Sequence, residues 1–231
     1  MAAAGSGERL GAGGPKAFVP LAGRPMIEWS IEAFRACDSV RAIVVAVPPG
    51  HVHDLAGHAD LGVVSGGATR AQSVANALEA VGTELVAIHD AARPLLTPDL
   101  VEALVGRLDA DPGAAGVIAA APVTDTIKET AVRTAFSILE MKKAVFAIEG
   151  TLDRGRLWAA QTPQVFRAEA LLAALEVDAD ARDAATDEAM LVEAAGGTVL
   201  IEPTSSENLK VTTPLDLQVA ELLLEHRAGW V

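Results

Sequence analysis

The first seventeen residues combine glycines, an arginine and a lysine in a pattern that could hold a polyphosphate. Gly5 and Gly7 let the backbone curl and bring its N–H groups close to an anion. Arg9 follows, and a guanidinium can form paired hydrogen bonds with phosphate oxygens. Pro15 and Lys16 end the segment with a fixed backbone angle and an ammonium group. The alternative is a frayed glycine-rich terminus, and the spacing matches neither the dinucleotide fingerprint nor the P-loop.

Further polar residues follow the apolar runs that we expect to be strands, where α/β sheets bind ligands. Residues 65–73 place two glycines and then Ser73 after a short apolar run, so a flat base could approach the backbone there. A tight turn with a helix cap is the alternative. Asp90 could hold a ribose hydroxyl or a magnesium ion, and Arg93 could hold a phosphate, unless the two form an ion pair. We expect the adjacent His89 to be a buried core histidine.

Polar segments also occur in the second half of the chain, at residues 124–128, 152–164 and 186–188. None of these predicts a reaction alone, and the last could simply cap a helix. Lys210 precedes the expected final helix. No second histidine lies at metal-ligand spacing from His89, so we predict no zinc site.

Composition narrows the function classes. The 231 residues are 51% hydrophobic, which is enough for the core of one domain. The formal charge of −13 argues against a nucleic-acid partner but not against a nucleotide. The single cysteine, Cys37, excludes an internal disulfide, and no apolar run approaches the ~20 residues of a membrane span. These features favour a cytoplasmic enzyme without a membrane partner.

Apolar runs alternate with helical patterns along the chain, which predicts an α/β fold with a mostly parallel sheet flanked by helices. Only residues 1–4 precede the glycine-rich loop, so we expect the first strand to be short. We expect one domain over residues 1–231. The expected helices are 27–35, 69–80, 98–108, 168–175, 187–195 and 214–227, and the expected strands are 42–47, 62–65, 85–88, 116–122 and 198–201.

Taken together, the motifs resemble those of the 2-C-methyl-D-erythritol 4-phosphate cytidylyltransferases, a nucleotidyltransferase family of isoprenoid precursor biosynthesis. The resemblance implies a Rossmann-like sheet, magnesium-dependent transfer of a cytidylyl group from CTP to methylerythritol phosphate, and a homodimer formed through a protruding β-arm at about residues 124–158. Ribitol-5-phosphate cytidylyltransferases share most of the motifs, and Ala91 and Ala92 favour the erythritol enzyme. Another sugar-phosphate nucleotidyltransferase and an inactive dimeric relative are the remaining alternatives. The resemblance covers residues 3–16, 66–73, 89–94, 125–128, 152–164, 186–188 and 208–212.

The resemblance also implies a role for individual residues. Asp90 is the one candidate for a direct magnesium ligand. Thr126 and Arg154 would lie on the arm and serve the partner's active site, and residues 135–150 look like an insertion into that arm. The implied catalytic residues are Arg9, Lys16 and Lys210. The implied nucleotide-binding residues are Ala3, Ala4, Gly5, Gly7, Gly67, Ala68, Ser73 and Asp90, and the implied acceptor-binding residues are Arg93, Thr126, Arg154, Thr162 and Thr186.

Overall fold

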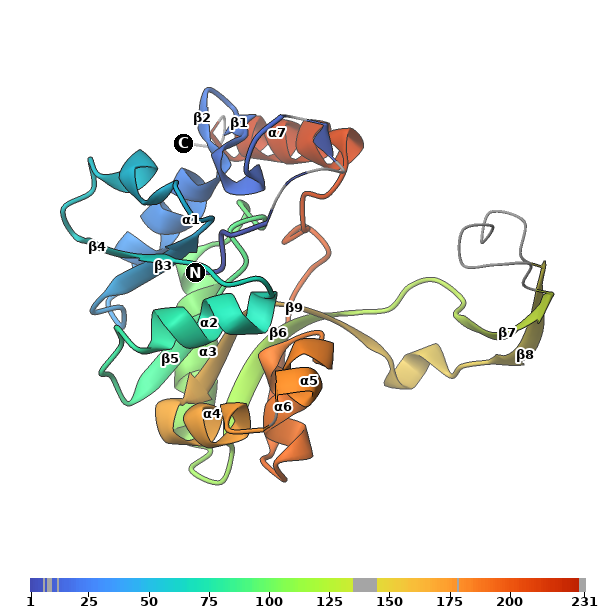
Figure 1. Ribbon diagram of the computed structural model, residues 1–231. Coiled ribbons are helices and arrows are strands. Elements are labelled where there is room, and N and C mark those ends of the chain that lie inside the picture. Colours follow the sequence, from blue (N-terminus) through green and yellow to red (C-terminus); the bar gives the residue numbers. More distant parts are fainter. Residues whose placement is uncertain (6, 8–9, 12, 135–144, 178, 229–231) are drawn as a thin grey trace.

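A sheet runs through the body of the computed structural model, which describes the chain apart from residues 6, 8–9, 12, 135–144, 178 and 229–231 (Figure 1). Residues 1–3 lie between two groups of strands, because Ala2 forms parallel bridges to both Ala46 and Asp90. The first strand is therefore short, as expected. On one side of it lies the parallel pair β3 (Ile43–Val47) and β4 (Leu61–Ser65), and on the other side four strands pair in the order β5 (Leu85–Ile88), β9 (Trp158–Arg167), β6 (Gly116–Pro122) and β10 (Val199–Pro203).

β9 is a strand that the sequence pattern did not reveal. It runs antiparallel to β5 and β6, whereas β6 and β10 are parallel, so the prediction of a mostly parallel sheet is confirmed with one exception. Gln161, Thr162 and Gln164 interrupt the apolar pattern of this segment. All three side chains are buried and bonded to groups distant in sequence, which local periodicity cannot predict.

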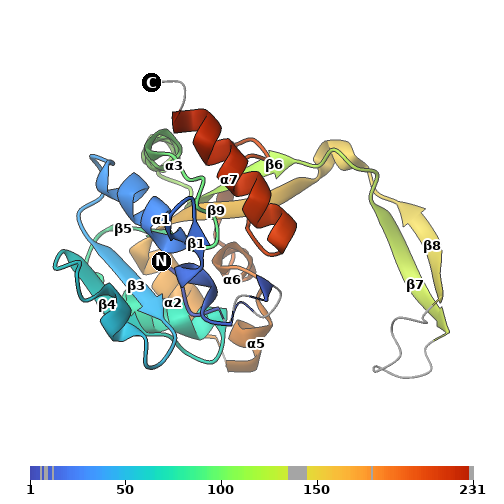
Figure 2. The same cartoon turned by 90° about the horizontal axis from the view of Figure 1, so that it is seen from above.

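The predicted helices are confirmed to within a few residues, and the short α5 was missed. Ile27, Ile31 and Phe34 are buried at the spacing that predicted the first helix. Helices α1 and α3 cover one face of the sheet, with α3 against β6 and β9, whereas α2, α4 and α6 cover the other face (Figure 2). No helix in the described part of the chain is long and apolar enough to cross a membrane. The helices are α1 (Met26–Arg35), α2 (Arg70–Leu78), α3 (Pro98–Ala110), α4 (Ala168–Leu175), α5 (Ala179–Ala184), α6 (Glu188–Ala194) and α7 (Pro214–Ala228).

A two-stranded arm projects from the body (Figures 1 and 2). It consists of the antiparallel strands β7 (Lys128–Thr134) and β8 (Val145–Thr151), with Lys128 opposite Thr151. Residues 145–150, which the sequence analysis placed in an insertion into the arm, form most of β8. The mixed spacing of apolar residues in this segment allowed both a helix and a strand, since β8 pairs with β7 in a two-stranded sheet that has no core behind it to impose alternation. Residues 135–144 lie outside the described part of the chain.

Gly116 allows β6 to lie against the ring of Phe166, and this contact makes a prediction. A Cβ atom at Gly116 would lie 2.3 Å from a ring carbon of Phe166, whose side chain is fully buried. Gly116→Ala should therefore destabilise the protein by about 1–3 kcal/mol. Gly106→Ala in α3 is the matched control, because nothing lies within 4 Å of its Cβ and alanine favours a helix.

The measurement is urea unfolding of both variants at an unchanged m-value. A Gly116→Ala variant as stable as Gly106→Ala would contradict this packing.

Candidate active site

A pocket of about 640 Å³ opens where residues 1–3, β4 and β5 end. Parallel α/β sheets bind ligands at this carboxyl edge. Most of the residues implied to bind nucleotide or to catalyse are brought together there, whereas the implied acceptor-binding residues do not line the pocket within this chain. The predicted residues that line it are Ala3, Ala4, Gly5, Gly7, Lys16, Gly67, Ala68, Ser73, Asp90 and Lys210.

The glycine-rich loop folds back on itself at the pocket wall. The backbone N–H of Lys16 donates to the carbonyl of Gly5 at 3.1 Å, which places the lysine beside the start of the loop. Gly7 has a φ of +74°, and a Cβ atom there would lie 2.9 Å from the carbonyl oxygen of Gly14. Glycine is therefore required at this turn by both conformation and space. Arg9, the other predicted phosphate contact of the loop, lies outside the described residues.

The second loop is held by the first turn of α2. The Ser73 hydroxyl accepts from the Gly67 N–H at 3.0 Å and donates to the Thr69 carbonyl at 2.9 Å. Thr69 also caps α2 by accepting from Gln72 N–H at 3.1 Å. Gly66 approaches Ala4 closely, since a Cβ atom at Gly66 would lie 2.6 Å from the Ala4 Cβ. Sequence analysis left two interpretations of this segment: a turn with a helix cap, or glycines that let a base approach the backbone. The structure has the helix cap at Thr69, and it also has Gly67 at the pocket wall.

Four charged side chains form a network at the floor of the pocket. Asp90 accepts from Arg70 Nε at 3.1 Å and from Lys210 Nζ at 2.7 Å. Arg70 also pairs with Glu188 at 2.5 Å, and Glu188 is only 1% exposed. Two cations therefore balance two carboxylates, and each oxygen of Asp90 faces a different cation.

The network shifts the pKa values of its two carboxylates, Asp90 and Glu188. Burial disfavours ionisation of Asp90, but the charges of Arg70 and Lys210 outweigh burial and hold its pKa well below its usual range. Burial raises the pKa of Glu188, and Arg70 offsets this only in part. Asp90 is therefore a permanent anion at neutral pH, with a fixed orientation.

Arg93 does not pair with Asp90, so that alternative is wrong. Its guanidinium donates to the carbonyls of Asn208 at 2.7 Å and Ala160 at 3.4 Å. Arg93 is buried, and burial lowers its pKa. Asp90 points instead toward Arg70, because the cation at the start of α2 lies on the pocket side of the sheet edge.

His89 is buried, as predicted, and connects several site residues. Its Nε2 lies 3.2 Å from the Arg93 carbonyl and its Nδ1 lies 3.1 Å from the Thr162 hydroxyl. The Arg93 carbonyl can only accept, so His89 Nε2–H donates to it and the Thr162 hydroxyl, which accepts from the Asp90 N–H, donates to Nδ1. This tautomer is assigned from the hydrogen-bond network. Burial lowers the pKa of His89 to about 3, so the ring is neutral and positions Thr162 and Arg93.

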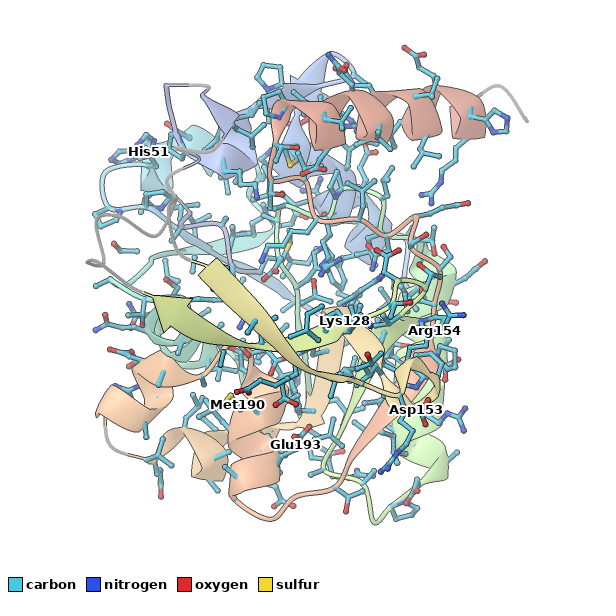
Figure 3. All side chains as sticks on the ribbon, turned by 90° about the vertical axis from the view of Figure 1, so that its right-hand side faces the viewer. His51, Lys128, Asp153, Arg154, Met190 and Glu193 are labelled. Carbon is cyan, nitrogen blue, oxygen red and sulfur yellow. The ribbon has the colours of Figure 1, made fainter. Side chains whose placement is uncertain are left out.

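The two predicted arm residues lie away from the pocket of their own chain. Thr126 is exposed in the segment that leads into β7. Arg154 begins the short turn η5 (Arg154–Arg156) at the stem of the arm, and its Nη1 donates to the Thr124 carbonyl at 2.6 Å (Figure 3). Thr186 is exposed two residues before Glu188, next to the charge network.

Sequence analysis assigned no role to Arg70, Glu188 or Asn208. Arg70 occupies the first turn of α2, where the helix dipole disfavours a cation, so its position signalled a carboxylate partner. Asn208 donates to the Gln161 side chain and the Thr162 carbonyl, both at 2.9 Å, and joins β9 to the segment before α7. Nothing local in the sequence pairs Asn208 with β9.

Metal-binding capacity at the site is limited to one carboxylate. No cluster of three or more His, Cys, Asp or Glu side chains in the described part of the chain could hold an ion. Asp90 is the acidic residue that lines the pocket.

This fold and this pocket define a nucleotidyltransferase, with a polyphosphate-type loop and two lysines at the carboxyl edge of an α/β sheet. The chain belongs to the 2-C-methyl-D-erythritol 4-phosphate cytidylyltransferase family, whose model matches residues 1–226.

Individual relatives agree with this assignment. The 2-C-methyl-D-erythritol 4-phosphate cytidylyltransferase of Synechococcus elongatus is 39% identical over 234 residues, which cover 97% of this chain and 94% of that protein. The Bifunctional enzyme IspD/IspF of an Anaeromyxobacter species is 43% identical over 97% of this chain, which spans only 56% of that longer protein.

Solved structures of relatives agree as well. The cytidylyltransferase structure from Thermus thermophilus has a TM-score of 0.75 at 31% identity, covering 94% of this chain and 96% of that one. The structure from Francisella tularensis has a TM-score of 0.76 at 28% identity, covering 95% of each chain. These comparisons do not favour the alternative of a ribitol enzyme.

The buried neutral His89 predicts how stability depends on pH. Its folded pKa of about 3 lies below the ordinary value of about 6.5, so the unfolded chain binds a proton that the folded chain does not. Stability should therefore fall as pH falls below 6.5, by about 2 kcal/mol between pH 7 and pH 5 from this group. His89→Gln can keep both hydrogen bonds without titrating.

The measurement compares urea unfolding of both proteins at pH 7 and pH 5, so that all other groups cancel. Equal pH dependences would show that His89 is not buried in its neutral form.

Proposed function

We propose that this protein transfers the cytidylyl group of CTP to 2-C-methyl-D-erythritol 4-phosphate and releases pyrophosphate. The observation that carries the proposal is the pocket at the sheet edge, where the glycine-rich loop, Lys16 and Lys210 surround Asp90. An oxygen of the acceptor phosphate attacks the α-phosphorus of CTP, and the bond from that phosphorus to the bridging oxygen of pyrophosphate breaks. Such a reaction depends on positioning and charge neutralisation, so it needs no enzyme nucleophile.

The nucleotide would enter along the two loops. The backbone of residues 3–5 and of Gly67 and Ala68 would contact the base and ribose, since these residues carry little or no side chain. The polyphosphate would follow the glycine-rich loop toward Lys16, where backbone N–H groups and an ammonium favour an anion. Arg9 would act on the same phosphates by the family resemblance.

Lys210 would link the two substrates. Its ammonium bonds Asp90 Oδ2 and is partly exposed to the pocket, so it can contact a bound phosphate while Asp90 retains Arg70. Arg93, Thr162 and Thr186 would bind the acceptor from the side of β9 and α6. Charge placed in advance needs no reorganisation when negative charge develops on the transferring group.

Magnesium fits this donor set. Mg²⁺ prefers oxygen ligands from substrate phosphates, waters and one or two carboxylates. Asp90, ionised and at the pocket floor, would hold the ion together with the triphosphate. The ion would neutralise triphosphate charge at the reacting phosphorus.

We also propose a homodimer formed through the arm, acting in the cytoplasm. Thr126 and Arg154 flank the arm strands β7 and β8 and do not line the pocket of their own chain, so a partner's pocket is the natural recipient. Phe146 and Ile148 on β8 are 51% and 65% exposed, which leaves apolar surface for a partner to cover. The lone buried thiol of Cys37 suits a reducing compartment.

The activity is tested by pyrophosphate release with CTP, Mg²⁺ and methylerythritol phosphate. Lys16→Ala should lower kcat roughly a hundred- to thousand-fold, because it removes a cation where charge develops. Arg107→Ala is the control, since it removes an exposed cation that pairs with Glu202 away from the pocket. A Lys16→Ala variant within a few-fold of wild type would refute the assigned role of Lys16, and faster turnover with ribitol 5-phosphate or UTP would refute the substrate assignment.

Complementation tests the shared site. Arg154→Ala should raise the KM for the acceptor far more than the KM for CTP, because a guanidinium suits a terminal phosphate. At an acceptor concentration well below the raised KM, Lys16→Ala and Arg154→Ala should each be nearly inactive, yet a mixture of the two should recover about a quarter of wild-type activity, because random pairing makes half of the dimers mixed, with one intact site in each.

If each arm served its own chain, no mixture would recover activity. Sedimentation of the same samples shows whether the loss reflects missing dimers or a missing contact.

A further inference from the structure

A buried carboxylate at the start of α6 holds the arginine of the charge network. Glu188 is 1% exposed, and both of its carboxylate oxygens accept from Arg70 Nη1, at 2.6 and 2.5 Å. The preceding residue fixes this end of α6, because Asp187 caps the helix and accepts from Gln164 Nε2 of β9 at 2.8 Å. Glu188 does not line the active-site pocket, whereas Arg70 does. Any effect of Glu188 on a bound substrate therefore passes through Arg70.

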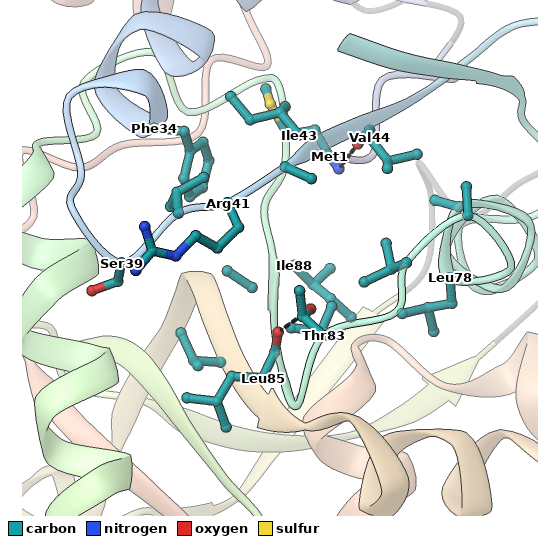
Figure 4. A pocket seen from close by; sticks show the side chains of 18 of the residues that line it. Met1, Phe34, Ser39, Arg41, Ile43, Val44, Leu78, Thr83, Leu85 and Ile88 are labelled. Atoms are coloured by element: carbon teal, nitrogen blue, oxygen red, sulfur yellow. Dashed lines mark hydrogen bonds between the residues drawn. The ribbon is translucent and has the colours of Figure 1, made fainter. Parts of the chain in front are cut away.

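The charge network belongs to the active-site pocket and not to the other cavity beside α2. That cavity, of about 300 Å³ and lined mainly by apolar residues, lies between β3 and β5 (Figure 4). Helix α2 reaches it at Leu78, but none of the four charged residues of the network lines it. The charges are thus confined to the start of α2, next to Asp90.

Stability alone does not account for a charged pair at this position. A buried ion pair is rarely more stabilising than apolar side chains of similar size, because the cost of removing both charges from water offsets their attraction. The residues of α6 that follow Glu188 and face the core are apolar, namely Ala189, Leu191 and Val192. An apolar side chain at position 188 would therefore suit the packing, and the carboxylate is better explained by the geometry that it gives to Arg70.

Glu188 limits how Arg70 contacts Asp90. A guanidinium that faces one carboxylate frequently binds both of its oxygens through two parallel N–H bonds. Because Nη1 is held by Glu188, Arg70 reaches Asp90 through Nε, at 3.1 Å from Oδ1. The other oxygen, Oδ2, accepts from Lys210 Nζ at 2.7 Å. The position of Lys210 in the pocket thus depends on which atoms of Arg70 are engaged by Glu188.

We propose that Glu188 is a positioning residue for the cytidylyl transfer: it holds Arg70 so that Arg70 uses one oxygen of Asp90 and leaves Oδ2 to Lys210. The inference rests on the proposed function for the role of Lys210. Without the charge of Glu188, Arg70 turns toward Asp90 and binds both carboxylate oxygens. Lys210 then loses its partner and its fixed place beside the reacting phosphates.

Lysine acetylation measures this geometry without the reaction. The full chain is treated with acetic anhydride, and mass spectrometry gives the acetylation rate of each lysine. In Glu188→Gln the rate at Lys210 should rise about three- to tenfold, because an ammonium must leave its carboxylate before its nitrogen can react. Lys128 in the arm is the internal reference, and Glu193→Gln, exposed on the same helix, is the matched control.

A second variant separates positioning from loosening of the site. In Arg70→Met/Glu188→Gln no guanidinium competes for Asp90, so Lys210 should react at the wild-type rate again. The same rise in the single and the double variant would show that loss of Glu188 only loosens the site, and would overturn the inference. An unchanged rate in Glu188→Gln would overturn it too, and so would a Glu188→Gln chain that melts below the assay temperature, because Glu188 would then act through stability.

Pyrophosphate release connects the geometry to the reaction. Glu188→Gln should lower kcat roughly tenfold, less than the loss of a whole cationic group, and should leave the KM for CTP within about threefold. Glu193→Gln should match wild type. A wild-type kcat in Glu188→Gln would show that the reaction does not depend on this geometry and would overturn the inference. A wild-type chain that releases no pyrophosphate would instead refute the proposed function, and acetylation would still decide how Glu188 positions Lys210.

Discussion

The backbone pairing of residues 1–3 holds the two parts of the sheet together. Ala2 N–H donates to His89 at 2.8 Å and Ala3 N–H donates to Ala46 at 2.9 Å, with return bonds from Ala91 and Ala46. These bonds connect β3 and β4 to the strands beside β5, and no other strand in the described chain joins the two groups. Because the same residues continue into the glycine-rich loop, the geometry of the pocket depends on this short stretch. The small side chain of Ala4 also permits the close approach of Gly66.

The charge network explains how a strongly acidic protein can bind a polyanion. Arg70 and Lys210 are matched by Asp90 and Glu188, so the pocket floor is close to neutral before a ligand binds. Glu188 is buried and holds Arg70, which leaves the exposed Lys210 to exchange with a ligand at low cost. Lys16 adds a further cation to the lining of the pocket. The acidic residues elsewhere on the surface do not line this pocket.

The arm differs from the body because its two strands pair without a hydrophobic core behind them. β7 and β8 pair with each other in a separate two-stranded sheet, and Phe146 and Ile148 on β8 are exposed. An isolated two-stranded hairpin is marginally stable in water, so an arm of this kind gains from a partner surface. Arg154 lies in η5, just before the start of β9, and β9 carries Thr162, so one continuous stretch of chain connects the arm to the acceptor side.

The sequence by itself determined the features that depend on neighbours along the chain. The helical spacing of Ile27, Ile31 and Phe34, the apolar run of β3 and the turn at Gly7 all follow from local periodicity and backbone freedom. Most residues of the pocket were identified through the family resemblance, whose short motifs are also local in sequence.

Only the tertiary structure decided the features that join distant residues. The antiparallel β9, the pairing of Arg70 with Glu188 across 118 positions and the bond from Arg93 to the Asn208 carbonyl have no local signal. A buried polar group must find a partner, but its own sequence does not say which one. The β8 strand was concealed for the related reason that a strand without a core behind it shows no alternation. The local sequence pattern thus predicted most helices and strands and the chemistry of the glycine-rich loop. The partners of buried polar groups were determined by contacts between residues that are distant in sequence.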